Sequence, residues 1–245
     1  MRIKDKILVR YIARMFKAGI LADGELTVSE EGVMQGSPCS PTIANIFAHH
    51  VIDEWFEEVV KEHCKGRVRL FRYADDAVIC CQFKEDAARI RSALSNRLEK
   101  YKLKLNEEKT SSVSFSRRGY EQGKAQGVFH FLGFTFYWGK TRKGHPIPRV
   151  ITHGKRMRSK LKNVNEWARL VRNKYRLTYV WNLFCAKLEG HIRYFGVSFN
   201  CKRVDTFVRK AVQILFKWLN RRSQRKSFDW EKFELFIKCI NSDLM

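Results

Sequence analysis

Apolar side chains recur at helical spacing in three stretches of the first half of the chain. The first covers residues 4–18. The second runs from Ser40 to about Glu62, and its start suits a helix because serine caps well and proline fits a first turn. The third runs from Glu85 to Tyr101. The pattern predicts three amphipathic helices.

Segments with a strand-like pattern lie between and after these helices. Residues 21–26 contain an Asp-Gly pair, which favours a hairpin. The β-rich runs Val68–Tyr73 and Ala77–Gln82 flank Ala74-Asp75-Asp76 and predict a strand, a tight turn and a second strand. Further short strands are expected at residues 111–115, 129–138 and 147–151.

From about Gly154 onward the pattern is almost purely helical, with Trp, Phe and Leu at helix spacing among Lys and Arg. We therefore expect an α+β fold, with an antiparallel sheet that carries helices on one face in residues 1–150 and a basic helical bundle in residues 151–245. The boundary falls in the Gly-, Pro- and basic-rich stretch Lys140–Arg158.

The charge is strongly positive and unevenly spread. The 245 residues include 48 Lys and Arg and 25 Asp and Glu, a net charge of +23. Residues 1–150 hold 26 basic and 18 acidic residues (26 − 18 = +8), and residues 151–245 hold 22 and 7 (22 − 7 = +15). An excess of this size is typical of proteins that neutralise phosphates, although a ribosomal or chromatin protein shows the same balance.

Targeting and redox signals are absent from the sequence. The seven cysteines form no C-x-x-C pair, which favours reduced thiols over a disulfide framework or a zinc site. No apolar run approaches the roughly 18 residues that span a bilayer. The basic N-terminus has no signal-peptide pattern. We expect a cytoplasmic protein without a membrane partner.

The adjacent carboxylates of Asp75 and Asp76 are the sharpest chemical feature. Each raises the pKa of the other unless a cation lies between them. Two carboxylates completed by substrate phosphates are a usual way of holding Mg²⁺. An ordinary solvent-exposed turn that binds no metal could have the same Asp-Asp sequence. Upstream, Gln35-Gly36-Ser37-Pro38 precedes the predicted helix at Ser40, and a helix start suits a phosphate; a plain connecting loop would look the same.

Taken together and in order, these segments resemble the blocks of the reverse transcriptase family, and specifically the group II intron reverse transcriptase/maturase type. The Gln35-Gly36 segment resembles its Pro-Gln-Gly block, and Tyr73-Ala74-Asp75-Asp76 its Tyr-Xaa-Asp-Asp block. Later segments resemble its LNxxKT block, its FLGF hairpin and its thumb and maturase region. They are Leu105–Thr110, Phe131–Phe134, Gly190–Val197, Phe216–Gln224 and Ser227–Glu231.

The resemblance implies roles for individual residues. Asp75 and Asp76 would be catalytic and bind Mg²⁺, and Tyr73, Gln35, Gly36 and Lys109 would border the nucleotide and template. Phe131, Leu132, Gly133 and Phe134 would form the primer grip. It also implies a palm in residues 1–150, a thumb/maturase bundle in residues 151–245, and three partners: an RNA template and primer, deoxynucleoside triphosphates, and structured intron RNA.

Two departures from the family pattern stand out. Met34 replaces the usual proline before Gln35, which loosens the loop but removes no chemical group. The family's first block, a strand that supplies a further metal-binding aspartate, has no counterpart ahead of the helix at residues 4–18. We therefore expect an N-terminally truncated member.

The basic residues of the second part are expected to bind RNA, because their surplus is too large for pairing within helices to absorb. They are Arg156, Arg158, Lys160, Arg169, Arg172, Arg221, Arg222, Arg225 and Lys226. The tryptophans between them are expected to face a bundle core.

Three functions fit these patterns. The first is an RNA-directed DNA polymerase that also assists splicing of its intron. The second is a catalytically incomplete maturase remnant that binds structured RNA. The third is one fragment of a split reverse transcriptase that works with a complementing N-terminal fragment.

Overall fold

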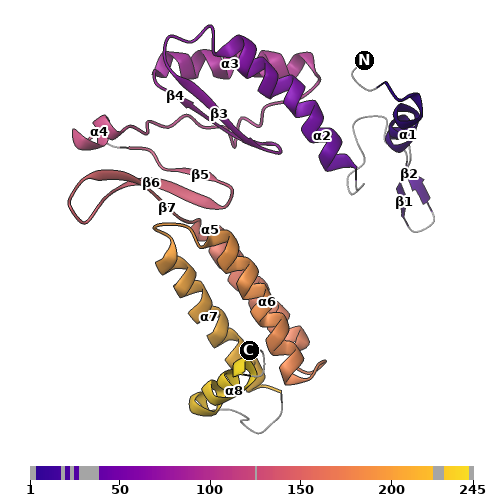
Figure 1. Cartoon of the computed structure of the whole chain (residues 1–245), viewed down its shortest axis with the longest axis vertical. Helices are drawn as coiled ribbons and strands as arrows, with labels where there is room; N and C mark the ends of the chain where they lie inside the picture. Colours follow the sequence, from indigo (N-terminus) through magenta and orange to yellow (C-terminus); the bar gives the residue numbers. More distant parts are fainter. Residues whose placement is uncertain are drawn as a thin grey trace. The chain divides into compact units, whose positions relative to one another are not determined.

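The computed structural model describes residues 4–17, 20–22, 25–27, 39–124, 126–222 and 229–242. The chain divides into two compact units, Met1–Ser112 and Val113–Met245, and each is described by itself (Figure 1). Both combine helices with small antiparallel sheets, so the expected α+β class is confirmed. The functional division into residues 1–150 and 151–245 stays a prediction.

The first unit begins with helix α1 (Lys6–Lys17) and the short strands β1 (Ile20–Ala22) and β2 (Glu25–Thr27), which pair antiparallel as the Asp-Gly signal predicts. Helix α2 (Ser40–Ala48) begins at the expected serine and proline. It continues into two π-helical segments, η1 (His49–Glu54) and η2 (Phe56–Val60).

The helix predicted from Ser40 to about Glu62 is therefore present to Val60, but its second half is π-helical. The buried residues of this half are Val51, Phe56 and Val60, which lie five and four residues apart. That spacing is wider than the 3.6-residue α-helical repeat and fits the wider turns of a π-helix.

The core of the first unit lies between one face of a hairpin and the helices. Strands β3 (Val68–Tyr73) and β4 (Asp76–Cys81) pair antiparallel, and helix α3 (Lys84–Lys100) follows them. The buried cluster comprises Phe56, Val60, Val68 and Ile90, with Leu70, Ile79 and Cys81 packed against it. Helices therefore cover one face of the hairpin, as the sequence predicts.

The second unit contains a three-stranded antiparallel sheet. The short helix α4 (Arg117–Glu121) precedes strands β5 (Phe129–Phe131), β6 (Phe134–Lys140) and β7 (Pro146–Thr152), which pair in chain order. The strand expected at residues 111–115 is absent from that described segment. The Ser114 carbonyl and the Ser116 amide instead bond singly to Gly127 and to the side chain of Gln126, so no ladder forms.

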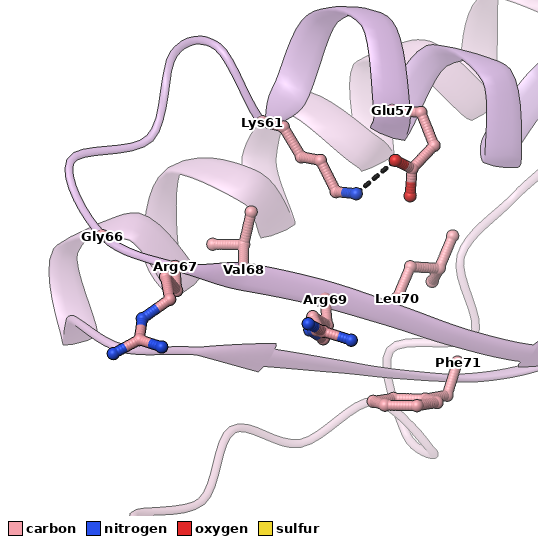
Figure 2. A pocket seen from close by; sticks show the side chains of 8 residues that line it. All are labelled: Glu57, Lys61, Gly66, Arg67, Val68, Arg69, Leu70 and Phe71. Carbon is pink, nitrogen blue, oxygen red and sulfur yellow. Dashed lines mark hydrogen bonds and ion pairs between the residues drawn. The ribbon is translucent and has the colours of Figure 1, made fainter.

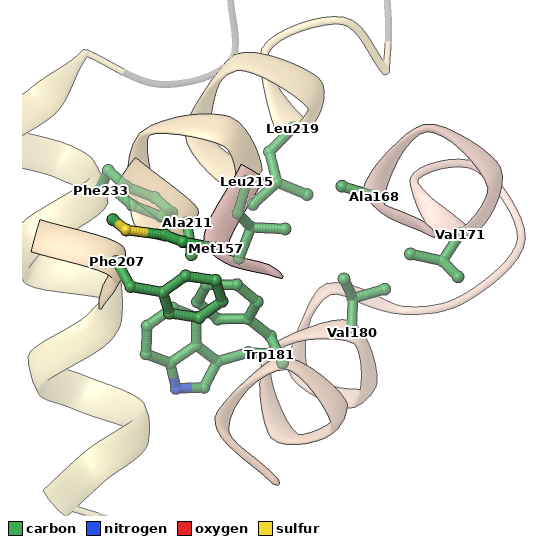
Figure 3. Packing of buried hydrophobic residues seen from close by; sticks show 11 residues of the cluster. Met157, Ala168, Val171, Val180, Trp181, Phe207, Ala211, Leu215, Leu219 and Phe233 are labelled. Atoms are coloured by element: carbon green, nitrogen blue, oxygen red, sulfur yellow. The ribbon is translucent and has the colours of Figure 1, made fainter. Parts of the chain in front are cut away.

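Helices form the rest of this unit: α5 (Gly154–Val171), α6 (Leu177–Phe195), α7 (Cys201–Leu219) and α8 (Trp230–Ser242). Their buried faces meet in an apolar core around Trp181, Phe184, Phe207, Leu215 and Phe233 (Figure 3). Trp167 and Trp218 pack against the same cluster, as expected for bundle tryptophans. Among the described helices, none has the length and apolar character that crossing a bilayer requires.

Candidate active site and nucleic-acid interface

The two adjacent carboxylates lie at the tip of the β3–β4 hairpin. Tyr73 pairs with Asp76 as the last register partners, so Ala74 and Asp75 form a two-residue turn. Ala74 has φ +53° and Asp75 has no positive φ, the combination of a type II′ turn. An alanine in the left-handed region costs about 1–2 kcal/mol, so other contacts must hold this turn in place.

Successive side chains of a strand point to opposite faces, and this places Tyr73 and Asp76 on the face of the hairpin away from the helices. Val68 and Leu70 face the core, so Phe71 and Tyr73 project from the opposite face together with Asp76. Tyr73 is 67% exposed, and both carboxylates are exposed. The predicted nucleotide-side tyrosine and the acidic pair therefore share one open surface.

The donor set at this tip fits Mg²⁺ in part. Asp75 and Asp76 offer carboxylate oxygens, the ligands that Mg²⁺ prefers, and this ion commonly uses one or two carboxylates together with water and substrate phosphates. Within the described residues no cluster of three or more His, Cys, Asp or Glu gathers here or elsewhere.

Arg72 holds the turn from the core side. Its Nε and Nη2 donate to the two carboxylate oxygens of Asp53 at 2.7 and 2.6 Å. Its Nη1 donates to Asn45 Oδ1 at 3.1 Å and to the Ala74 carbonyl oxygen at 2.8 Å. The hydrogen bond with Arg72 is the main cause that lowers the pKa of Asp53, and it likewise raises the pKa of Arg72. Both groups are therefore charged.

Arg72, Asp53 and Asn45 were not predicted as residues of the site. A signal was present, because Arg72 follows Val68 and Leu70 at the alternate positions that face the core. A charged residue at a core-facing position needs a partner, since an unpaired buried charge is costly. The partner on η1 lies 19 residues away in sequence, and periodicity gives no means of finding it.

A groove of about 490 Å³ runs beside β3, toward the end of the strand away from the turn (Figure 2). It is lined by residues of η2, of β3 and of the segment between them, among them Lys61, Arg67 and Arg69, and Lys61 is paired with Glu57. Asp75 and Asp76 are not among its lining residues. The carboxylates therefore belong to an exposed tip rather than to this groove.

The other nucleotide-side predictions fall in two places. Gln35 and Gly36 lie outside the described residues. Lys109 is exposed in the turn after α3, where its amide donates to the Asn106 side chain at 3.1 Å. The structure gives Lys109 no contact with the carboxylate turn, so its role stays a prediction.

The predicted primer-grip residues form the β5–β6 turn of the second unit. Phe131 pairs with Phe134, and Leu132 and Gly133 have φ +50° and +78°, as in a type I′ turn. This turn splits the run that the strand-like pattern predicted at residues 129–138, and it agrees with the hairpin that the family resemblance implies at Phe131–Phe134. The Tyr194 hydroxyl donates to the Leu132 carbonyl at 2.9 Å. The Phe134 ring is stacked on Tyr194 at 5.8 Å, so α6 supports the turn directly.

Two cations of α5 lie close to this turn. A Cβ placed on Gly133 would be 3.7 Å from Arg156 Nε and 3.6 Å from the nearest atom of the Phe195 ring. Lys160 Nζ lies 4.9 Å from the centre of that same ring. Burial, and then the charge of Arg156, lower the pKa of Lys160. Arg156 and Lys160 are thus like charges held near each other, and within the described chain no carboxylate pairs with either.

A second cationic group surrounds the Trp218 ring. Arg172 and Arg221 lie 4.9 and 5.4 Å from the ring centroid, and Lys217 lies at 5.4 Å. Trp218 Nε1 donates to Asn165, which fixes the ring. The cations gain cation–π attraction there, but no ion pair with a described acidic residue. We call Arg172, Lys217 and Arg221 the Trp218 cluster.

The remaining predicted RNA-binding residues are spread more widely. Arg158 and Arg169 lie on α5, and Arg222 donates to the Tyr175 carbonyl at 3.3 Å. Arg225 and Lys226 lie outside the described residues. Whether any of these residues binds RNA stays a prediction.

Paired carboxylates at a hairpin tip, with helices behind one face and the other face open, are consistent with the palm of a polymerase. Residues 2–136 match the model of the reverse transcriptase (RNA-dependent DNA polymerase) family, and the chain belongs to this family. The match includes both the Asp75-Asp76 turn and the β5–β6 turn. No curated protein matches the chain.

Proposed function

We propose that the chain is an RNA-directed DNA polymerase of the group II intron type, which also binds structured intron RNA. Its substrates would be an RNA template, a primer and deoxynucleoside triphosphates. Membership of the reverse transcriptase family supports the reaction class. The structural observation that supports the proposal most directly is the exposed Asp75-Asp76 pair on the open face of a hairpin.

In this proposal Asp75 and Asp76 hold Mg²⁺, and the family uses divalent metal ions in general. When bound, Mg²⁺ neutralises phosphate charge and favours attack of a primer 3′-hydroxyl on the nucleotide. Tyr73, exposed beside the acidic pair, offers a ring surface to a sugar or base. Gln35, Gly36 and Lys109 are assigned to the nucleotide and template side on the family resemblance alone.

The β5–β6 turn is assigned to the primer. Its backbone is held by Tyr194 and by the His153 amide, which donates to the Gly133 carbonyl at 2.9 Å. A fixed turn can orient a primer end, and orientation supplies a large part of the rate in such reactions. Arg156 and Lys160 beside the turn offer positive charge to a phosphate backbone.

The RNA-binding part of the proposal rests on cations that lack acidic partners in the described chain. In the Trp218 cluster three positive charges surround one ring. Elsewhere in the bundle, Arg209 and Arg193 pair with Asp205 and Glu189. A polyanion would relieve the repulsion within the cluster, and release of its counterions would make binding salt-dependent.

The same cationic surface supports a second candidate function, an RNA-binding maturase that does not polymerise. Nothing in the Trp218 cluster depends on the carboxylate turn, so RNA binding without synthesis is physically possible. A third arrangement places the chain in a split enzyme with a complementing N-terminal fragment. These alternatives differ in activity, not in the residues that bind RNA.

Primer extension on an RNA template with Mg²⁺ tests the polymerase proposal. The chain is assayed alone and with a separately supplied N-terminal fragment of a reverse transcriptase. We expect extension that Asp75→Asn or Asp76→Asn abolishes, whereas Asp205→Asn, a carboxylate change on α7, leaves it intact. Extension only with the fragment indicates the split enzyme. No extension in either case, with RNA binding retained, indicates the maturase remnant.

Salt titration of RNA binding tests the cationic surface. Arg172→Gln and Arg221→Gln should each weaken binding and reduce the slope of log affinity against log salt by about 1. Arg209→Gln, which removes a cation already paired with Asp205 at 2.9 Å, is the matched control and should change the slope much less. Equal effects of all three variants would contradict the assignment of the Trp218 cluster.

A further inference from the structure

We propose that Arg72 is a positioning residue for the Asp75-Asp76 turn, and that it acts by fixing the peptide between Ala74 and Asp75. The inference rests on the proposed function, because it concerns the geometry of the same carboxylates. Neither the family match nor the sequence patterns assign a role to Arg72. Its four hydrogen bonds join the turn, α2 and η1 in one network.

The contact with the Ala74 carbonyl is the informative one. Type I′ and type II′ turns share a positive φ at the first central residue and differ in the orientation of the central peptide. Here that peptide joins Ala74 to Asp75, and its carbonyl oxygen points to Arg72 Nη1 at 2.8 Å. In a trans peptide the N–H points the opposite way. Arg72 therefore selects one of two orientations for the backbone that carries Asp75.

The remaining contacts fix the guanidinium itself. Asp53 binds it in a fork, with two hydrogen bonds of 2.7 and 2.6 Å, and Asn45 takes up a further donor. The Arg72 side chain is 11% exposed and its two bonds to Asp53 are partly buried, so little solvent competes for that ion pair. A planar group with five donors can serve Asp53, Asn45 and Ala74 at once, whereas a lysine ammonium on a flexible stem cannot keep the same geometry.

The network also joins two predicted parts of the site. Asn45 lies on α2, the helix that begins shortly after Gln35 and Gly36 in the sequence. Arg72 connects this helix to the carboxylate turn through a single rigid side chain. A displacement of α2 would therefore move the Ala74 carbonyl, and with it the backbone of Asp75.

A purely structural role would give a different pattern. An ion pair that only stabilises the fold affects the free energy of unfolding, and any loss of function then follows the loss of folded protein. Positioning predicts that metal binding and the rate of nucleotide addition change in molecules that remain folded. Residues that orient metal ligands through hydrogen bonds typically change affinity or activity by about 10- to 100-fold when altered.

The test uses the full chain with Arg72→Lys, Asp53→Asn and, as a matched control, Arg89→Lys. Arg89 pairs with the buried Asp86 at the start of α3, so its replacement weakens an ion pair that does not touch the turn. For each variant, thermal unfolding, Mn²⁺ binding followed by electron paramagnetic resonance, and single-turnover nucleotide addition are measured. Asp75→Asn reports on the proposed function itself.

We expect Arg72→Lys to lower Mn²⁺ affinity and the addition rate by about tenfold or more in folded protein. Asp53→Asn should act in the same direction with a smaller effect, because Arg72 keeps its bond to Ala74. If Arg72→Lys does not fold, Asp53→Asn still tests the positioning role of Arg72. Arg89→Lys should change the unfolding temperature but not the other two readouts.

Each contrary result has a distinct meaning. If Arg72→Lys and Asp53→Asn shift only the unfolding temperature, as Arg89→Lys does, Arg72 is structural and the positioning proposal is overturned while the polymerase proposal stands. If the parent chain binds no Mn²⁺, or if Asp75→Asn changes neither Mn²⁺ binding nor nucleotide addition, the proposed function fails and the role of Arg72 fails with it.

Discussion

His191 on α6 should make the stability of the chain depend on pH between about 4 and 6.5. The side chain is 4% exposed, its ring stacks on Phe207 with centroids 3.6 Å apart, and its Nδ1 has no partner in the structure. Burial, and then the charge of Lys160, lower the pKa of His191 from 6.5 to about 4. The imidazole is therefore neutral in the folded protein at pH 7.

The sign and size of the effect follow from this pKa. As the pH falls below 6.5, the unfolded chain binds a proton at His191 before the folded chain does, so stability is lost until the pH reaches about 4. A difference of about 2.5 pKa units corresponds to a loss of about 3 kcal/mol over this window. Above pH 6.5 the residue is neutral in both states and contributes no slope.

The assay is urea unfolding of the parent chain and of His191→Phe at intervals between pH 4 and pH 8. Phenylalanine keeps the ring contacts with Phe195 and Phe207 but cannot titrate. Any packing cost of the larger ring is the same at every pH, so only the difference between the two pH profiles matters. Profiles that run parallel from pH 6.5 to pH 4 would refute the reasoning.

Three further predictions concern the second unit. Phe184→Ala should lower the free energy of unfolding by about 3–5 kcal/mol, because the ring is 1% exposed in the bundle core; a urea denaturation midpoint close to that of the parent would contradict this. Asn200→Ala should cost about 1–3 kcal/mol, because it leaves the Thr152 amide without its partner in a buried place and removes one of the two donors to the Phe195 carbonyl, which keeps the Val197 amide; calorimetry of the variant measures the loss. Tyr194→Phe should cost only about 1 kcal/mol but should speed hydrogen exchange at the β5–β6 turn, and unchanged exchange there would show that the hydroxyl does not hold it.

Features that depend on nearby residues were predictable from the sequence. The β3–β4 hairpin follows from two alternating runs around a two-residue turn, and α3 follows from its apolar spacing. The pairing of Tyr73 with Asp76 sets the whole register. The acidic turn could therefore be located at the tip of a hairpin with no knowledge of the rest of the fold.

Features that depend on distant residues were not predictable in the same way. The bond from Tyr194 to Leu132 joins residues 62 positions apart, and the fork between Arg72 and Asp53 joins residues 19 apart. The π-helical turns of η1 and η2 also escaped prediction, because an apolar pattern of mixed spacing reads as an α-helix. The resemblance to the reverse transcriptase family located the candidate catalytic residues in the sequence, whereas tertiary contacts determine the conformation of the Asp75-Asp76 turn and of the β5–β6 turn.

The buried side chain of Asn200 has a mechanical consequence. Its amide joins the last residue of β7, Thr152, to the carbonyl of Phe195 at the end of α6, and Tyr194 fastens the same helix to the β5–β6 turn. A force applied along α6 is therefore delivered at two neighbouring points of one end of the sheet, the β5–β6 turn and the end of β7. A nucleic acid that pulls on the surface of the bundle would therefore move α6 and the β5–β6 turn together as one rigid body, and would not change the angle between them.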